Sequence, residues 1–214
     1  MRNLEIKNND CHAALAMTKS VQSGRSMIEM LGVLAIIGVL SVGGIAGYSK
    51  AMHRYRINKY IEQITLIVGN IRTFFAPQRN YAGLNKTILK KAKLVPDEMW
   101  DGNNIEDVFG LEVSIHSGCY YSCSDNKAFT VRTLGKVDDE TFIDIASYDW
   151  SVVGCRIIGG YGMHSGFMEM PADLDSIITF REKLKSNSYG ATEGMIFICD
   201  LDPKSTDGQT LLAY

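Results

Sequence analysis

Apolar residues dominate one stretch near the start of the chain. From Met27 to Gly47 the sequence carries one charged residue, Glu29, and residues 30–47 carry none. A helix over these 18 residues would rise about 27 Å, close to the thickness of the hydrocarbon core of a bilayer. A helix in a globular core normally keeps a polar face, and this stretch has none. The pattern predicts a membrane-spanning helix over residues 27–47.

After residue 48 the pattern becomes amphipathic but stays helical. Apolar residues recur at steps of three and four, while most charged residues fall on other faces. The apolar positions are Ile57, Ile61, Ile64, Ile67, Val68, Ile71, Phe74 and Phe75. Pro77 biases Ala76 away from helix and supplies a stop. We therefore expect one continuous helix over residues 25–76, apolar all round in its first half and striped in its second.

Five glycines interrupt the apolar part of this helix: Gly32, Gly38, Gly43, Gly44 and Gly47. Each lowers the stability of an exposed helix by up to about 1 kcal/mol. Close packing against other helices explains them. The alternative is a segment near Gly43 and Gly44 that unwinds when the chain assembles.

Residues 77–110 are expected to form a surface-exposed connecting segment. Asn85 could cap a short helix that runs through Leu94, and KLVPDEMWDG carries Pro and Gly turn residues.

Residues 111–214 show strand and helix patterns in alternation. Asp138 or Asp139 could cap a helix ending at Tyr148, and Asp173 a second one through Lys185. Five segments have strand composition: Leu111–Ser117, Phe129–Leu134, Val152–Ile158, Gly166–Met170 and Met195–Leu201. A twisted antiparallel sheet packed on the amphipathic half of the long helix would bury both, which makes the fold class α+β.

Net charge and cysteine content narrow the function. A formal net charge of −2, with no long basic tract, gives no reason to expect nucleic-acid binding. The five cysteines are Cys11, Cys119, Cys123, Cys155 and Cys199. If the segment with Cys11 is removed, four remain, which suits disulfides in an oxidising compartment with three pairings open. Reduced cysteines in a cytosolic domain, and zinc held by four thiolates, are the alternatives.

The sequence SGRSMIEMLGVLAIIGVL resembles the class III leader of type IV pilins and pseudopilins. In that family cleavage follows a glycine, and a glutamate stands at the fifth mature position; Gly24 and Glu29 match if Arg25 is the first mature residue. The family usually has Phe, Met, Leu or Val there, so Arg25 is a departure. LVPDEMW followed by FGLEVSI is a second, looser similarity to pilins.

The resemblance implies a type IVb-like major pilin, a structural subunit that polymerises into a surface filament for adhesion, motility or DNA transfer. Prepilin peptidase would remove the leader, residues 1–24, and Arg25 would be N-methylated. The α-amine of Arg25 on a neighbouring pilin subunit would neutralise Glu29 during assembly. The alternative is a glutamate at the membrane interface, bonded to lipid headgroups or to exposed amides of the helix start.

The implied location is the inner membrane before assembly and an extracellular pilus afterwards, with the head, residues 111–214, in the periplasm or outside the cell. Four Lys or Arg precede the span and four follow it, so the charge rule for orientation gives no answer. The pilus assembly machinery is an implied partner; a host surface or DNA is a candidate that no residue pattern supports.

For the cysteines, the resemblance supports a Cys155–Cys199 disulfide, which would join two expected strands. Cys119 and Cys123 would then pair with each other. In an extended strand their α-carbons would lie about 13 Å apart, too far for a disulfide, so the chain must turn between them.

No nucleotide, metalloprotease or nucleophile motif is present, and we expect no enzyme activity, cofactor or bound metal. A His116–Cys119 pair is a thiol–imidazole candidate, and a histidine at a strand end is the simpler interpretation. Three alternatives remain: a minor pilin or type II secretion pseudopilin, an uncleaved membrane-anchored ectodomain that binds or catalyses, and a cytosolic enzyme with a long core helix.

Overall fold

The computed structural model describes residues 27–118, 126–158, 167–168, 171–186 and 195–200. The chain divides into two compact units, Met1–Gly47 and Tyr48–Tyr214. The described part of the first unit is helical throughout. The second unit contains the sheet and the hydrophobic core.

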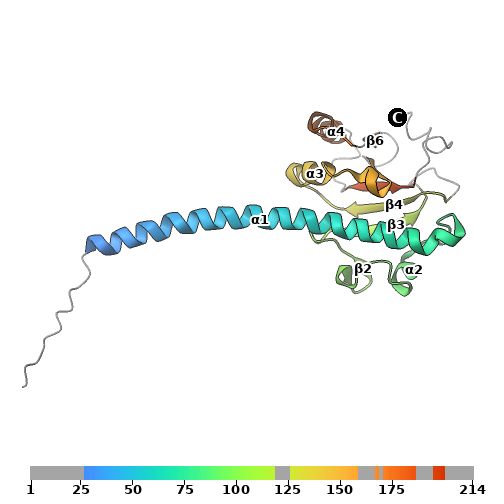
Figure 1. Ribbon diagram of the computed structural model, residues 1–214, viewed down its shortest axis with the longest axis horizontal. Helices are drawn as coiled ribbons and strands as arrows, with labels where there is room; N and C mark the ends of the chain where they lie inside the picture. The colour runs from blue at the N-terminus through green and yellow to red at the C-terminus, as the bar shows by residue number, and fades with distance from the viewer. Residues whose placement is uncertain (1–26, 119–125, 159–166, 169–170, 187–194, 201–214) are drawn as a thin grey trace, which may run out of the picture. The chain divides into compact units, whose positions relative to one another are not determined.

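The long helix is present as α1 (Met27–Phe75), drawn in blue to green in Figure 1. It gives way to a 3₁₀ turn, η1 (Ala76–Gln78), that contains Pro77, and Arg79 then adopts a left-handed conformation with φ 57°. This end agrees with the predicted effect of Pro77 on the preceding residue. The expected start at Arg25 lies outside the described residues.

Five strands form one antiparallel sheet in the order β3-β4-β7-β5-β6. Their bounds are β3 (Glu112–Ser117), β4 (Phe129–Leu134), β5 (Cys155–Ile158), β6 (Phe167–Met168) and β7 (Ile196–Cys199). The last strand among the described residues, β7, therefore lies between β4 and β5, and the α+β prediction is confirmed.

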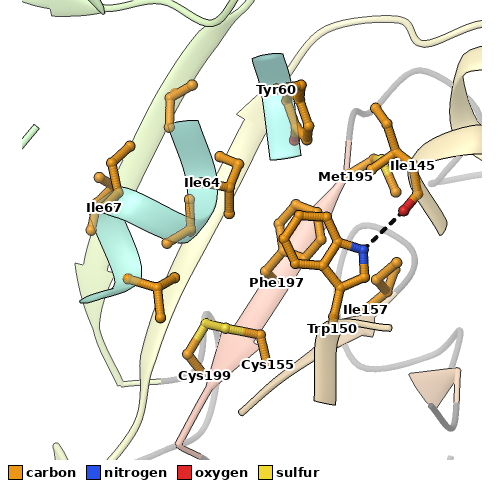
Figure 2. Close-up of a cluster of buried hydrophobic side chains, with 14 of the residues drawn as sticks. Tyr60, Ile64, Ile67, Ile145, Trp150, Cys155, Ile157, Met195, Phe197 and Cys199 are labelled. Atoms are coloured by element: carbon orange, nitrogen blue, oxygen red, sulfur yellow. Dashed lines mark hydrogen bonds between the residues drawn. A yellow bond between two sulfur atoms is a disulfide. The ribbon is translucent and has the colours of Figure 1, made fainter. Parts of the chain in front are cut away.

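The core lies between this sheet and the second half of α1. Alternation along β4 puts Phe129, Val131 and Thr133 on one face, and the register sets Phe197 of β7 beside Val131. Tyr60 of α1 contacts both Thr133 and Phe197. Figure 2 shows the isoleucines of α1 and the indole of Trp150 around the same cluster. The amphipathic pattern of the helix therefore matches the face that the sheet covers.

Two helices follow the sequence prediction closely. The Asp138 side chain accepts a hydrogen bond from the Thr141 N–H (2.9 Å) at the start of α3 (Asp139–Ala146). Asp173 caps α4 (Leu174–Ser186) through the Ser176 N–H at 2.8 Å. An oxygen acceptor at the N-cap satisfies an amide that the first helical turn leaves without a partner.

The predicted strand Val152–Ile158 is wrong in its first half. Residues Trp150–Val153 form a 3₁₀ turn, η3, because the Asp149 side chain accepts from the Ser151 N–H. Gly154 ends this turn in the left-handed region, with φ 63°. Only from Cys155 onwards is the chain extended.

The expectation that residues 77–110 are surface-exposed holds only in part. The segment forms α2 (Lys86–Lys91), the 3₁₀ turn η2 (Asp97–Met99) and a ribbon of β1 (Trp100–Asp101) with β2 (Asn104–Ile105). Asn85 caps α2 as expected, but the helix ends before Leu94. Seven apolar side chains of this segment are buried: Tyr81, Leu84, Leu89, Leu94, Val95, Met99 and Ile105. The segment is therefore part of the core of the second unit.

Candidate functional site

The first half of α1 exposes an unbroken apolar surface. All described residues from Met27 to Gly47 are exposed, among them Leu34, Val39 and Ile45. Within the described part of the chain, α1 is the one helix long and apolar enough to cross a membrane. A soluble surface does not normally expose so large an apolar area, so this surface requires lipid or another protein as its environment.

The glycines in this part of α1 are not required by contacts inside the subunit. A Cβ atom added at Gly32, Gly38, Gly43 or Gly44 would meet no other atom within 4 Å. Their small size is therefore not explained by the packing of one chain.

Glu29 lies in the first turn of α1 and is exposed. A carboxylate there interacts favourably with the positive end of the helix dipole. Gly24 and Arg25, the other two residues of the leader motif, lie outside the described residues.

In the second unit, a disulfide links Cys155, the first residue of β5, to Cys199, the last residue of β7, with an S–S distance of 2.01 Å. The two cysteines are direct partners on the neighbouring strands β5 and β7, and both are fully buried. This is the pairing that the resemblance favoured. It excludes zinc bound by four thiolates, while Cys119 and Cys123 lie outside the described residues.

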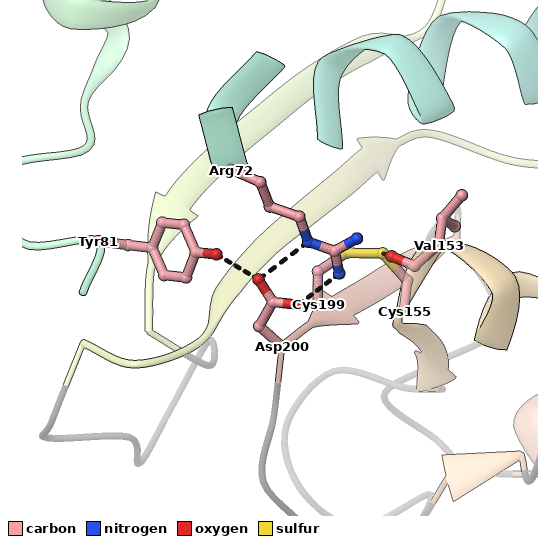
Figure 3. Close-up of a disulfide and its surroundings, with 6 residues drawn as sticks. All are labelled: Arg72, Tyr81, Val153, Cys155, Cys199 and Asp200. Carbon is pink, nitrogen blue, oxygen red and sulfur yellow. Dashed lines mark hydrogen bonds and ion pairs between the residues drawn. A yellow bond between two sulfur atoms is a disulfide. The ribbon is translucent and has the colours of Figure 1, made fainter. Parts of the chain in front are cut away.

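Three polar side chains from distant parts of the sequence converge beside this disulfide (Figure 3). Asp200, directly after Cys199, accepts hydrogen bonds from the Arg72 guanidinium of α1 and from the Tyr81 hydroxyl. Its own N–H donates to the Gly154 carbonyl at 3.0 Å. We call Arg72, Tyr81 and Asp200 the Asp200 cluster.

The Asp200 cluster is partly buried, and its charges compensate one another. Burial and the neighbouring Asp200 carboxylate raise the pKa of the Tyr81 hydroxyl above its ordinary value. The hydroxyl is therefore a proton donor at neutral pH, which suits the acceptor beside it. The cluster joins α1 to the strand that carries Cys199, and no sequence motif marks its three residues.

A second buried contact joins α1 to the centre of the sheet. The Tyr60 and Thr133 hydroxyls lie 2.7 Å apart, and burial raises the pKa of Tyr60. Nearby, the Gln63 side chain accepts from the Val108 N–H (3.2 Å) and donates to Glu98. These bonds fix α1 relative to the sheet and to the 77–110 segment.

Catalytic and metal-binding features are sparse. No group of three His, Cys, Asp or Glu that could hold a metal ion occurs among the described residues. His116 lies beside the Ser114 hydroxyl. Its pKa is lowered mainly by burial and to a smaller extent by the positive charge of Arg132. Its proposed partner Cys119 is outside the described residues.

The sequence is similar to one known protein family and to two characterised relatives. The model of the family described as Bundlin matches residues 50–158. Two relatives are 27% identical over 134 residues, with 61% of this chain and 67% of the relative covered in each case. Both are called the major structural subunit of bundle-forming pilus, one from Escherichia coli O127:H6 (strain E2348/69 / EPEC) and one from Escherichia coli O111:H-.

Proposed function

Because this chain belongs to the bundlin family of type IV pilins, we propose that it builds a pilus as its major structural subunit. It is a structural subunit of a pilus on the outside of the cell, and homologous pilin subunits are its partners. The observation that carries the polymerisation mechanism is the exposed apolar surface of α1 over residues 27–47.

The apolar surface needs two environments in turn. Before assembly, a bilayer would surround the helix, which has the length and composition of a membrane span. After assembly, identical helices would replace the lipid. The glycines support this second state, because residues without side chains let helices approach closely without changing the packing of one subunit.

Glu29 would set the register between neighbouring helices. A carboxylate on an apolar helix is costly to bury without a partner, at roughly 2.5–3.5 kcal/mol on insertion scales for an acidic residue at mid-bilayer. Prepilin peptidase would cut after Gly24 and free the α-amine of Arg25, with N-methylation following at that amine. The amine of one subunit would then pair with Glu29 of the next.

Intact-mass measurement with N-terminal fragmentation tests this proposal. The chain is isolated from membranes of a host that carries its leader peptidase. We expect it to begin at Arg25, with or without one added methyl group, and to be recovered also in sheared surface filaments. A chain that still begins at Met1 and never enters filaments would instead indicate a permanently anchored ectodomain.

A variant at the cleavage site provides the control. Gly24→Val should leave the precursor intact in the same membranes, because the small residue before the cut is missing. Normal cleavage of this variant would show that the site is assigned to the wrong bond.

A further inference from the structure

Three cations follow directly after the apolar part of α1, and the described residues provide them with no counter-charge. Lys50, Arg54 and Arg56 are all exposed. Among the described residues, none forms an ion pair or side-chain hydrogen bond with any of the three. They therefore differ from the other basic residues of the same helix.

The basic residues further along α1 are paired within the subunit. Lys59 lies 2.8 Å from Glu98, and the Arg72 guanidinium contacts Asp200. His53, which stands between the three cations in sequence, lies 2.9 Å from Asp144 of α3. The described part of the fold thus supplies acidic partners for these other basic residues of α1 and none for Lys50, Arg54 and Arg56.

The three cations point in different directions around the helix. At about 100° per residue, Arg54 lies about 40° from Lys50, while Arg56 lies about 160° from Arg54. Tyr48 and Tyr55, which are 68% and 58% exposed, occupy a further direction. A contact with one neighbouring protein would use one face of the helix. A ring of cations that surrounds the helix within about 9 Å along its axis fits a planar environment such as a membrane surface.

The position and composition of this ring fit the interfacial region of a bilayer. Tyrosine, lysine and arginine are the residues that accumulate where the hydrocarbon core meets the headgroups. Helical side chains lean toward the helix N-terminus, so these side chains lean back toward the apolar segment. Lys50 lies about one helical turn beyond Gly47, where the apolar segment ends, and Arg56 lies about two and a half turns beyond it.

We propose that Tyr48, Lys50, Arg54, Tyr55 and Arg56 form a headgroup-binding belt that holds the subunit in the membrane by contacts with anionic phospholipids. The belt cations bind lipid phosphates, and the two tyrosines lie at the level of the headgroups. This inference rests on the proposed function, because it requires α1 to span the bilayer. The belt also gives a reason for the Lys and Arg residues that follow the span, whereas the charge rule for orientation gives none because equal numbers of cations lie on both sides.

The test uses the full chain in vesicles that mix phosphatidylcholine and phosphatidylglycerol. Electron paramagnetic resonance of spin-labelled forms of the two lipids gives the ratio of their association constants with the protein. One basic residue near an anionic surface contributes about fivefold in affinity. We expect the wild type to prefer phosphatidylglycerol, and the belt variant Lys50→Gln, Arg54→Gln, Arg56→Gln to lose most of that preference.

A matched variant controls for total charge. Arg79→Gln, Lys91→Gln, Lys93→Gln removes the same number of exposed cations from the second unit at positions away from the belt, and should keep the wild-type ratio. A belt variant that also keeps the wild-type ratio would overturn the proposal. Loss of filaments by the belt variant at an unchanged lipid ratio would overturn it too, because the cations would then contact another subunit.

The same vesicles separate this inference from the proposed function. If the wild-type chain does not float with the vesicles, α1 does not insert, and the membrane step of the proposed function fails. If it floats normally and shows no headgroup preference, only the belt is wrong.

Discussion

At the scale of single residues, Gly154 combines a left-handed backbone with close contact to a charged side chain. Its φ is +63°, and an added Cβ would collide with the Arg72 guanidinium that binds Asp200. We expect Gly154→Ala to lower the free energy of unfolding by about 2–3 kcal/mol, about 1–2 of it from the backbone conformation. Urea denaturation of the purified second unit or of the whole chain in detergent measures this loss.

Gly83 is the matched position for that measurement. It also has a positive φ, +86°, but a Cβ there would meet no atom within 4 Å. Gly83→Ala should therefore lose only the backbone part, about 1–2 kcal/mol. Equal losses for the two variants would mean that the contact with Arg72 has no energetic importance.

Asp107 should give the protein a pH-dependent stability. One carboxylate oxygen accepts from the Phe109 and Leu111 N–H groups, and the other has no hydrogen-bond partner among the described residues. Burial raises the pKa of this carboxyl above its ordinary 3.8. The folded state therefore holds the proton to a higher pH than the unfolded state. The resulting stabilisation is complete below about pH 4 and is lost as the pH rises through the folded-state pKa.

The variant Asp107→Asn removes this titration. The unfolding free energy of the wild type relative to Asp107→Asn should fall as the pH rises from about 4 toward neutrality, measured by urea denaturation across that range. Asp101→Asn, at an exposed position in β1, serves as the control. Parallel stability curves for the wild type and Asp107→Asn would contradict the assignment.

At the scale of elements, the Tyr60–Thr133 hydrogen bond measures how firmly α1 is joined to β4. The two hydroxyls are buried and 2.7 Å apart. We expect Tyr60→Phe to lower the unfolding free energy by about 1–2 kcal/mol, because the Thr133 hydroxyl then stays buried without that partner. Tyr60→Phe with Thr133→Val should cost less than the sum of the single changes. Strict additivity in this cycle would show that the two groups do not interact.

The disulfide joins two strands that already pair, so its removal should weaken the fold without abolishing it. Cys155 and Cys199 are separated by 44 residues, and a closed loop of this size contributes about 3–4 kcal/mol. Cys155→Ala with Cys199→Ala should lower the melting temperature correspondingly. Adding a reductant should lower the melting temperature of the wild type by more than it lowers that of the double variant, because only the wild type has the Cys155–Cys199 bond to lose. An unchanged melting temperature in the double variant would contradict this role.

The elements also show what a single sequence can predict. The bounds of β4 agree with the prediction, because a short run of β-branched and aromatic residues, here buried on both faces except at its last residue, marks a strand. The pair Val152 and Val153 has the same composition but lies in a 3₁₀ turn, where the Asp149 cap and Gly154 decide the backbone. Local side-chain hydrogen bonds of this kind compete with strand formation, and composition alone does not reveal them.

At the scale of the whole molecule, contacts between residues far apart in the sequence are the features that the sequence does not predict. Arg72 and Tyr81 lie 128 and 119 positions from Asp200, and none of the three belongs to a motif. Likewise, the buried residues of the 77–110 segment are irregularly spaced between turns, so no period indicated that they face a core. The apolar half of α1 was predictable because its function requires a continuous run of residues of one kind.

The second half of α1 packs in the core, whereas the first half is exposed. We therefore expect that changing Glu29, in the first half, affects assembly and not folding. Glu29→Gln should leave the melting temperature of the second unit and the removal of residues 1–24 unchanged. A hydrogen bond to a charged group contributes about 1.5–3 kcal/mol, so subunit association should weaken by about 10- to 100-fold and sheared filaments should become scarce. Glu62→Gln is the matched change, on the same helix but beside Lys59 at 3.6 Å within the subunit, and it should assemble normally. Abundant filaments from Glu29→Gln would place the register-setting contact elsewhere on α1.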